Sequence, residues 1–210
     1  MSTQKEETRA RLFSAARKLL VKRGFHGVGL EDIAEAAGVS RQAVYKSHFA
    51  SKAELLLALV RHLHVAEKLD DLVLPYLAAP SGLEMLREGI RTIVLIEARI
   101  HDIALVLTAA ALTDTGAAAA LHDRLEVKRG ALRGALERVQ AEGHFSSAWQ
   151  IEEAVEVLAA LLSVDTYQRL VNELGWSPER LIRRVQELSQ TFLSLPAARE
   201  PPQKRERARG

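Results

Sequence analysis

The sequence predicts an all-α fold, in which a small N-terminal helix-turn-helix domain precedes a larger helical domain. Three observations indicate this fold. Ser or Thr followed three residues later by Glu or Gln, a helix-start signal, recurs along the chain. Apolar residues repeat at spacings of three and four, and strand-like alternation is nearly absent. The 210 residues are enough for one large or two small domains with a sizeable core, and the pattern predicts about nine helices.

The first three helices lie in the first fifty residues. The first runs over about 3–23 and ends before Gly24. The second, over 30–37, is stopped by Gly38, which tolerates the left-handed backbone of a helix end. The third begins at Ser40, whose hydroxyl can cap it. A helix, a tight glycine turn and a second helix make a helix-turn-helix unit.

The remaining helices form the larger domain. They are expected over about 51–71, 82–100, 101–112, 118–142, 148–174 and 178–195. The predicted capping pairs are Thr3/Glu6, Ser51/Glu54, Ser81/Glu84 and Ser147/Gln150, with Ser177 before Pro178 as a further start. Breaks are expected at Pro75, Pro80, Gly143 and Gly175 and over residues 113–116. We therefore expect domains at 1–50 and 51–195, followed by a disordered basic tail at 196–210.

Composition excludes several classes of site. The chain has no cysteine, so disulfides, thiolate metal sites and cysteine nucleophiles are absent. The longest apolar stretch, over 103–112, is about half of what a bilayer requires, and the charged N-terminus does not resemble a secretory signal. We expect a cytoplasmic protein without a membrane partner, a metal or a cofactor.

Charge is distributed unevenly along the chain. Residues 1–52 carry ten Lys and Arg against five Asp and Glu, and residues 196–210 carry five against two. Residues 53–195 have a net charge of −6. A basic N-terminal region on an acidic body indicates a polyanionic partner. Chance and solvated helix faces are the alternative explanation.

The predicted third helix has the residue types that read DNA. Arg41 can bind guanine and Gln42 adenine in bidentate fashion, while Ala43 permits close approach to the major groove. Hydrogen-bond donors suited to phosphates surround them: Ser40, Tyr45, Lys46, His48 and Lys52. The segment is poor in acids, as a phosphate-facing surface requires. A helical hairpin with a solvated surface remains the alternative.

The run "GFHGVGLEDIAEAAGVSRQAVYKSHFASKAELL", residues 24–56, resembles the DNA-binding domain of the TetR family. The resemblance implies a homodimeric transcription regulator, usually a repressor, whose variable helical domain binds a small ligand and whose last two long helices pair across the dimer. For a DNA-binding protein in the cytoplasm we also expect association with the nucleoid. Two departures stand out: Val28 and Gly29 replace the usual Thr or Ser before the second helix, and the spacing from Tyr45 to Phe49 is one residue longer.

Two C-terminal helices carry a candidate dimer interface. The helix predicted over 178–195 has an apolar seam, and the one over 148–174 has small residues that permit close approach. The candidate interface residues are Ala154, Leu158, Leu161, Leu181, Val185, Leu188 and Phe192. Burial of both helices within one subunit is the alternative.

Misplaced polar residues mark a candidate ligand pocket. Glu97 interrupts an apolar stripe, His101 lies one helical turn later, and Lys128 interrupts a second stripe. Further candidate lining residues are Met85, Ile93, Leu105 and His122. The alternative is a buried Glu97–Lys128 or Glu97–His101 pair with no ligand.

These observations favour a ligand-responsive DNA-binding regulator whose effector is small and hydrophobic. An enzyme would need a nucleophile or metal ligands, and Glu97 with His101 is the single helical pair that suggests one, so we expect no enzymatic activity and no catalytic residue. A DNA-binding protein with a structural or protein-partner role is the third possibility; a closed core near Glu97 would favour it.

Overall fold

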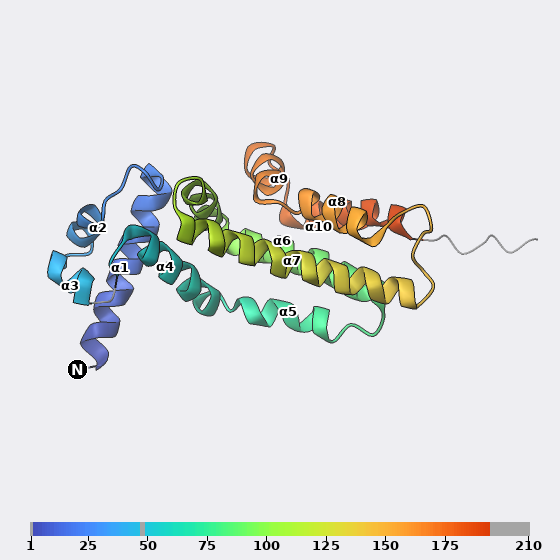
Figure 1. Ribbon diagram of the computed structural model, residues 1–210, viewed down its shortest axis with the longest axis horizontal. Helices are drawn as coiled ribbons and strands as arrows, with labels where there is room; N and C mark the ends of the chain where they lie inside the picture. The colour runs from blue at the N-terminus through green and yellow to red at the C-terminus, as the bar shows by residue number, and fades with distance from the viewer. Residues whose placement is uncertain (1, 47–48, 194–210) are drawn as a thin grey trace, which may run out of the picture.

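The computed structural model describes residues 2–46 and 49–193, which form an all-α protein without a β-strand among them (Figure 1). The helices are α1 (Ser2–Arg23), α2 (Leu30–Ala36), α3 (Arg41–Lys46), α4 (Lys52–Ala66), α5 (Leu69–Leu77), α6 (Gly82–Ala111), α7 (Thr115–Ala141), α8 (Ile151–Leu161), α9 (Val164–Tyr167), the π-helix η1 (Gln168–Glu173), α10 (Pro178–Ser189) and the 3-10 turn η2 (Gln190–Phe192). The predicted fold class is confirmed. The tail predicted over 196–210 lies outside the described residues. No helix in the described part of the chain is both long and apolar enough to cross a membrane.

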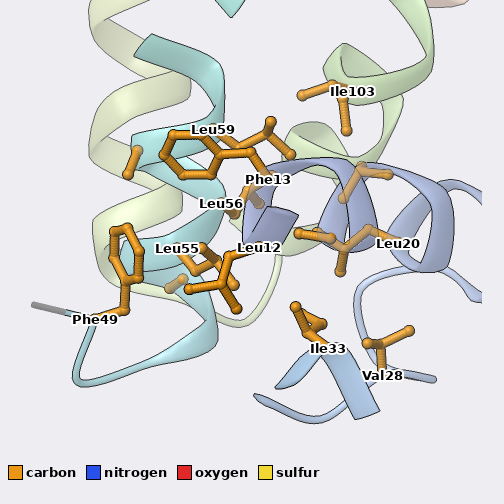
Figure 2. Close-up of a cluster of buried hydrophobic side chains, with 14 of the residues drawn as sticks. Leu12, Phe13, Leu20, Val28, Ile33, Phe49, Leu55, Leu56, Leu59 and Ile103 are labelled. Atoms are coloured by element: carbon orange, nitrogen blue, oxygen red, sulfur yellow. The ribbon is translucent and has the colours of Figure 1, made fainter. Parts of the chain in front are cut away.

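Two hydrophobic clusters hold the helices together. The N-terminal cluster combines the buried faces of α1 to α4 with the second half of α6, including Leu12, Ile33, Leu56 and Ile103 (Figure 2). The C-terminal cluster combines the first half of α6 with α7, α8 and α10. The buried side chains of α4 thus belong with those of α1 to α3, whereas the domain boundary at residue 50 remains a prediction.

The turn between α2 and α3 forms by the mechanism that the sequence predicts. Gly38 has a φ of +63°, a left-handed conformation that glycine adopts without a Cβ clash. The Gly38 amide donates to the Glu35 carbonyl at 2.9 Å, and the Val39 amide donates to Ala34 at 3.0 Å. These two bonds close the end of α2. The Ser40 hydroxyl then accepts from the Ala43 amide at 3.2 Å, so the predicted cap of α3 is confirmed.

Lys52 ties this unit together from the start of α4. Its Nζ donates to the Phe25 carbonyl and, at 2.7 Å, to the Val28 carbonyl. The ammonium also lies 4.2 Å from the centre of the Phe25 ring. A positive charge at a helix N-terminus is unfavourable by itself. Its bonds to the turn between α1 and α2 therefore offset that cost, while burial lowers the Lys52 pKa.

α6 and α7 form a long antiparallel hairpin at the centre of the molecule (Figure 1). Gly82, the first residue of α6, lies directly against the end of α7. A Cβ at this position would lie 2.5 Å from the Val139 amide nitrogen, so the position requires glycine. The Gly82 amide donates to the Glu142 carboxylate at 2.8 Å. Arg138 donates to the carbonyls of Ala79 and Pro80, at 2.9 and 2.7 Å. These bonds attach the loop before α6 to the end of α7.

The structure corrects the helices predicted over 82–100 and 101–112, which are one helix, α6. Nothing between Arg99 and Ile103 breaks a helix, and the Glu97–His101 pair bridges the predicted boundary within one turn. α7 begins at Thr115 rather than at 118, because Asp114 caps it by accepting from the Ala117 amide.

The helix predicted over 51–71 is also wrong, because it is divided at Lys68. Lys68 has a φ of 49°, in the left-handed region of backbone conformation that residues other than glycine rarely adopt. Arg99 of α6 holds this bend by donating to the Glu67 carbonyl at 2.6 Å. Pro75 was expected to break the chain, yet it lies within the last turn of α5.

The helix predicted over 148–174 is three segments: α8, α9 and η1. α8 ends at Leu161, and Ser163 starts a new segment by accepting from the Thr166 amide at 3.1 Å. Of the predicted capping pairs, those at Ser51, Ser81 and Ser177 are confirmed. The pair at Ser147 is wrong, since Gln150 caps α8 with Glu153. α1 begins at Ser2, one residue before Thr3, and the pair predicted at Thr3 stays a prediction because the Thr3 side chain lies outside what the structure describes.

Removal of the Lys52 ammonium should destabilise the protein. The Lys52→Ala variant leaves the Phe25 and Val28 carbonyls without their donor, which should lower the free energy of unfolding by about 1–3 kcal/mol. Urea denaturation followed by circular dichroism measures this loss. Lys18→Ala, on the exposed face of α1, is the matched control and should change stability little. Equal effects of the two substitutions would show that the Lys52 bonds contribute nothing specific.

Candidate nucleic-acid interface and joint cavity

α3 presents a short polar face to solvent. Val44 is buried against the N-terminal cluster, whereas Ser40 and Gln42 are exposed and Ala43 is half-buried. The Gln42 side chain is therefore open to a partner at the first turn of the helix, where a recognition helix meets base edges. Arg41, Tyr45 and Lys46 belong to α3, but their side chains and the whole of His48 lie outside what the structure describes.

Asp32 compensates for the missing Thr or Ser before α2. Its Oδ2 accepts from the Gly29 amide at 2.6 Å, so a carboxylate reaches back from the first turn to the residue before the helix. Val28 is buried, and its carbonyl accepts from Lys52. The N-terminus of α2 is therefore capped in spite of the Val28–Gly29 departure, although no side chain at 28 or 29 can donate to phosphate.

Lys52 has a structural role that the sequence did not predict. Two carbonyls of the turn between α1 and α2 accept from its Nζ, while its predicted contact with phosphate stays a prediction. These carbonyls lie 24 and 27 residues away along the chain, so the sequence pattern carried no signal of them. Lys52 positions the helix-turn-helix unit, and contact with phosphate is left to its remaining hydrogen.

A cavity of about 520 Å³ opens between α1, α6 and the α9–η1 segment; we call it the joint cavity. Its volume lies within the range of small-molecule sites. Its lining residues are Arg17, Leu20, Val21, Gly24, Phe25, Ala98, Arg99, His101, Asp102, Leu105, Val106, Ala109, Tyr167, Gln168 and Asn172. Of the predicted ligand residues, only His101 and Leu105 are among them. The cavity thus lies nearer to the N-terminal helices than the sequence predicted.

The structure does not bring the other predicted ligand residues together around this cavity. Met85 and Ile93 pack against the C-terminal cluster. His122 is exposed on α7. Lys128 donates to the Leu162 carbonyl at 3.0 Å, where α8 ends. Its pKa is lowered by burial, which Glu97 only partly opposes.

Glu97 and His101 form a buried pair inside α6. His101 Nδ1 lies 2.7 Å from Glu97 Oε1, and its Nε2 lies 2.8 Å from Gln168 Oε1. The two residues are only 9 % and 8 % exposed. Burial lowers the His101 pKa, but the hydrogen bonds to Glu97 and Gln168 outweigh burial and raise it above its ordinary value. One of the predicted alternatives, a buried Glu97–His101 pair, is therefore present.

Arg124 is a second cation near Glu97 that the sequence analysis missed. Burial lowers the Arg124 pKa, and the Glu97 charge opposes this effect. Its spacing of four residues from Lys128 places both cations on the same side of α7. This spacing from Lys128 is the sequence feature from which Arg124 could have been predicted to lie near Glu97.

Arg17 connects the N-terminal helices to α6. Its Nε and Nη2 donate to the Asp102 carboxylate at 2.8 and 3.1 Å, a bidentate pair. Its Nη1 lies 3.5 Å from Glu67 Oε1. The bonds to Asp102 raise the Arg17 pKa above its ordinary value despite partial burial. We call this contact the Arg17 clamp; its partners are 85 residues apart, so no local pattern could predict it.

Most of the predicted dimer residues lie inside a single protomer. Five of them are buried in the C-terminal cluster: Ala154, Leu158, Leu181, Val185 and Phe192. Leu181 and Val185 of the predicted seam are buried, but they pack within the protomer, where α10 contacts the chain's own α6 and α8, and this corrects their assignment to the interface. Leu161 is half-buried and Leu188 is 51 % exposed.

Comparison with known proteins agrees with this geometry. The sequence model of bacterial regulatory proteins of the tetR family matches residues 12–59, which span most of α1 to α4. The HTH-type transcriptional activator FasR of Mycolicibacterium smegmatis is 45 % identical over 69 residues, which are 33 % of this chain and 29 % of FasR. The chain therefore covers less than a third of that relative's length.

Solved structures match over most of the chain. A tetR-family regulatory protein from Rhodococcus RHA1 has a TM-score of 0.72 at 19 % identity, covering 90 % of this chain and 98 % of its own. FadR from Bacillus subtilis, solved in complex with stearoyl-CoA, has a TM-score of 0.70 at 17 % identity, covering 88 % and 99 %. At such identities the likeness concerns the fold. Residues 12–59 thus match the tetR family of bacterial regulatory proteins, and the chain as a whole shares the fold of these solved structures.

Proposed function

We propose that this protein is a sequence-specific DNA-binding transcriptional regulator that binds an inverted-repeat operator as a homodimer and responds to a small ligand. The observation that carries the proposal is the helix-turn-helix unit, in which α3 is fixed by the Gly38 turn, the Ser40 cap and the burial of Val44. Its exposed first turn suits entry into the major groove. We propose the repressor role and action on the nucleoid in the cytoplasm on the same basis.

The DNA contacts that we propose combine base readers with phosphate donors. Gln42 and Arg41 read bases at the start of α3, and Ala43 permits close approach. Ser40, Tyr45, Lys46 and His48 are the proposed phosphate donors, and Lys52 supports them from the start of α4. The excess of basic residues over 1–52 supports the same surface.

A binding function fits the polar residues of α6 better than an enzymatic one. Glu97 and Gln168 occupy both ring nitrogens of His101, so neither nitrogen is available as a general base. The joint cavity beside His101 supports a ligand response over a purely structural role. We propose it as the effector site, with His101 and Leu105 in its wall.

We propose that the dimer forms through the outer faces of α8 and α10, which lie next to each other (Figure 1). Val157, Ala160 and Leu161 on α8 and Leu188 on α10 are exposed or half-buried there. Two copies of this face would make a self-complementary interface of four helices. The buried apolar residues of α8 and α10 hold these two helices in place within each protomer.

Selection from a random duplex library with the purified full chain tests the function. We expect an inverted-repeat consensus, with half-sites about one helical turn or a multiple of it apart, as a two-fold dimer requires. Sedimentation of the protein–DNA complex should give two chains per operator. Recovery of salt-sensitive, sequence-blind binding alone would reject a sequence-specific regulator.

Gln42 should determine sequence preference at one base pair of each half-site. We expect Gln42→Ala to weaken operator binding by about 5- to 150-fold, equivalent to about 1–3 kcal/mol. Non-specific binding should stay unchanged, because the amide does not neutralise phosphate. Fluorescence anisotropy with operator and scrambled duplexes measures both. The Gln140→Ala variant, on the exposed side of α7, should bind as the wild type does; an equal loss on both duplexes would exclude base reading by Gln42.

The buried histidine pair should give stability a specific pH dependence. Because the folded His101 pKa lies above its ordinary value, the pair stabilises the protein fully below about pH 6.5 and loses this contribution as pH rises through the folded pKa. The charged and polar groups around it are Glu97 and Asp102 on α6, Arg124 and Lys128 on α7, and Tyr167 and Gln168 on the α9–η1 segment.

We therefore expect His101→Gln to lower the urea midpoint more at pH 6 than at pH 9. Urea denaturation at both values measures the difference. His144→Gln, at an exposed turn, should leave the profile parallel to that of the wild type. Parallel profiles for His101→Gln and the wild type would show that the His101 charge does not contribute to stability.

A further inference from the structure

The joint cavity is lined by side chains of two chemical kinds, which we call its aliphatic wall and its polar wall. One wall is aliphatic, with Leu20 and Val21 of α1 and Leu105, Val106 and Ala109 of α6. The other is polar, with Arg17, Arg99, Asp102, Gln168 and Asn172. Val21 is 46 % exposed, so apolar surface remains open on the first wall. A molecule that satisfies both walls must be amphipathic.

Two arginines lie side by side on the polar wall, and only one of them has a carboxylate. Arg17 uses its Nε and Nη2 on Asp102, and its Nη2 also lies 3.4 Å from the Arg99 carbonyl oxygen. Arg99 donates to the Glu67 and Lys68 carbonyls, and both bonds leave from Nη1. Among the described residues no carboxylate pairs with Arg99. Its Nε and Nη2, the fork that Asp102 fills on Arg17, are thus unoccupied by protein.

The charges around the fork limit what it accepts. Asp102 and Glu67 both pair with Arg17, whereas Arg99 has no acidic partner among the described residues of this wall. The four charges sum to zero, so an anion is held here by the hydrogen-bond donors of the fork, and a single negative charge meets the least repulsion from the two acids. A dianion such as a phosphate monoester would place its second charge beside Asp102 and Glu67, which is unfavourable.

From this arrangement we propose that the joint cavity binds a small monocarboxylic acid with an aliphatic body. The carboxylate occupies the open fork of Arg99, and the body lies against Val21, Leu105 and Ala109. The site touches both α1 and α6, so its occupant contacts the Arg17 clamp that joins them. The inference deepens the proposed function, because it assigns a ligand class to the proposed effector site.

The test compares two ligands that differ only in the head group. Isothermal titration calorimetry of the full chain without DNA should show decanoate binding at least about tenfold more tightly than decan-1-ol. Arg99→Gln should abolish this preference. Arg91→Gln, the same substitution on an exposed position of α6, should retain it. Ala109→Phe fills the aliphatic wall and should weaken decanoate binding at least about tenfold.

Equal affinity for the two ligands in the wild type, or decanoate binding that survives Arg99→Gln unchanged, would overturn the proposal. Because the head-group comparison uses the wild type, it holds even where Arg99→Gln loosens the bend at Lys68. The titration contains no DNA, so its result is separate from the duplex selection. Decanoate preference without operator selection would reject the proposed function alone, and operator selection without decanoate preference would reject this inference alone.

Discussion

The thirty-residue helix α6 is the element on which the other helices depend, because it belongs to both hydrophobic clusters. Its first half contributes Leu86, Ile90 and Val94 to the C-terminal cluster. Its second half contributes Ile103 (Figure 2) and Leu107 to the N-terminal cluster, and α6 contacts α1 and α4 there. A rigid helix that is shared by two cores transmits a displacement of one core to the other. The position of the helix-turn-helix unit is therefore fixed relative to the C-terminal bundle through α6.

The polar residues of α6 are concentrated where it passes from one cluster to the other. Glu97, Arg99, His101 and Asp102 fall between the last apolar residues of the C-terminal cluster and the main apolar face of the N-terminal cluster. Each has a partner on another element or on α6 itself, so the segment is neither core nor plain surface. Among these contacts the Arg17–Asp102 pair is partly exposed and breaks at small cost, whereas the buried Glu97–His101 pair does not. The joint cavity therefore borders one contact that opens easily and one that holds α6 in place.

Local chemistry explains which features the sequence predicted. The Gly38 turn, the Ser40 cap and the starts at Ser51, Ser81 and Ser177 depend on residues within five positions of one another, and all are confirmed. Contacts between distant residues were missed. The carbonyl partners of Lys52 lie far back in the chain, and the Arg17 clamp joins positions that no periodicity relates. The bend at Lys68 contains neither Gly nor Pro; it is held by Arg99, so only tertiary structure specifies it.

The energetics of the joint limit how an effector can act. Arg17 and Asp102 are about one-third exposed, and exposed ion pairs typically contribute about 0.2–1 kcal/mol. A free energy of about 1 kcal/mol corresponds to about a fivefold change in affinity, so loss of a clamp of this typical strength would change DNA affinity by about fivefold. Larger responses, of up to about 150-fold in typical allosteric proteins, need a second source of energy. Lys68, with its left-handed backbone, follows Glu67, whose carbonyl accepts from Arg99. Relaxation of this strained bend would release free energy, and a ligand bound to Arg99 contacts the residue that holds the bend. An effector at Arg99 would therefore act on both the clamp and the bend, and their sum sets the size of the response.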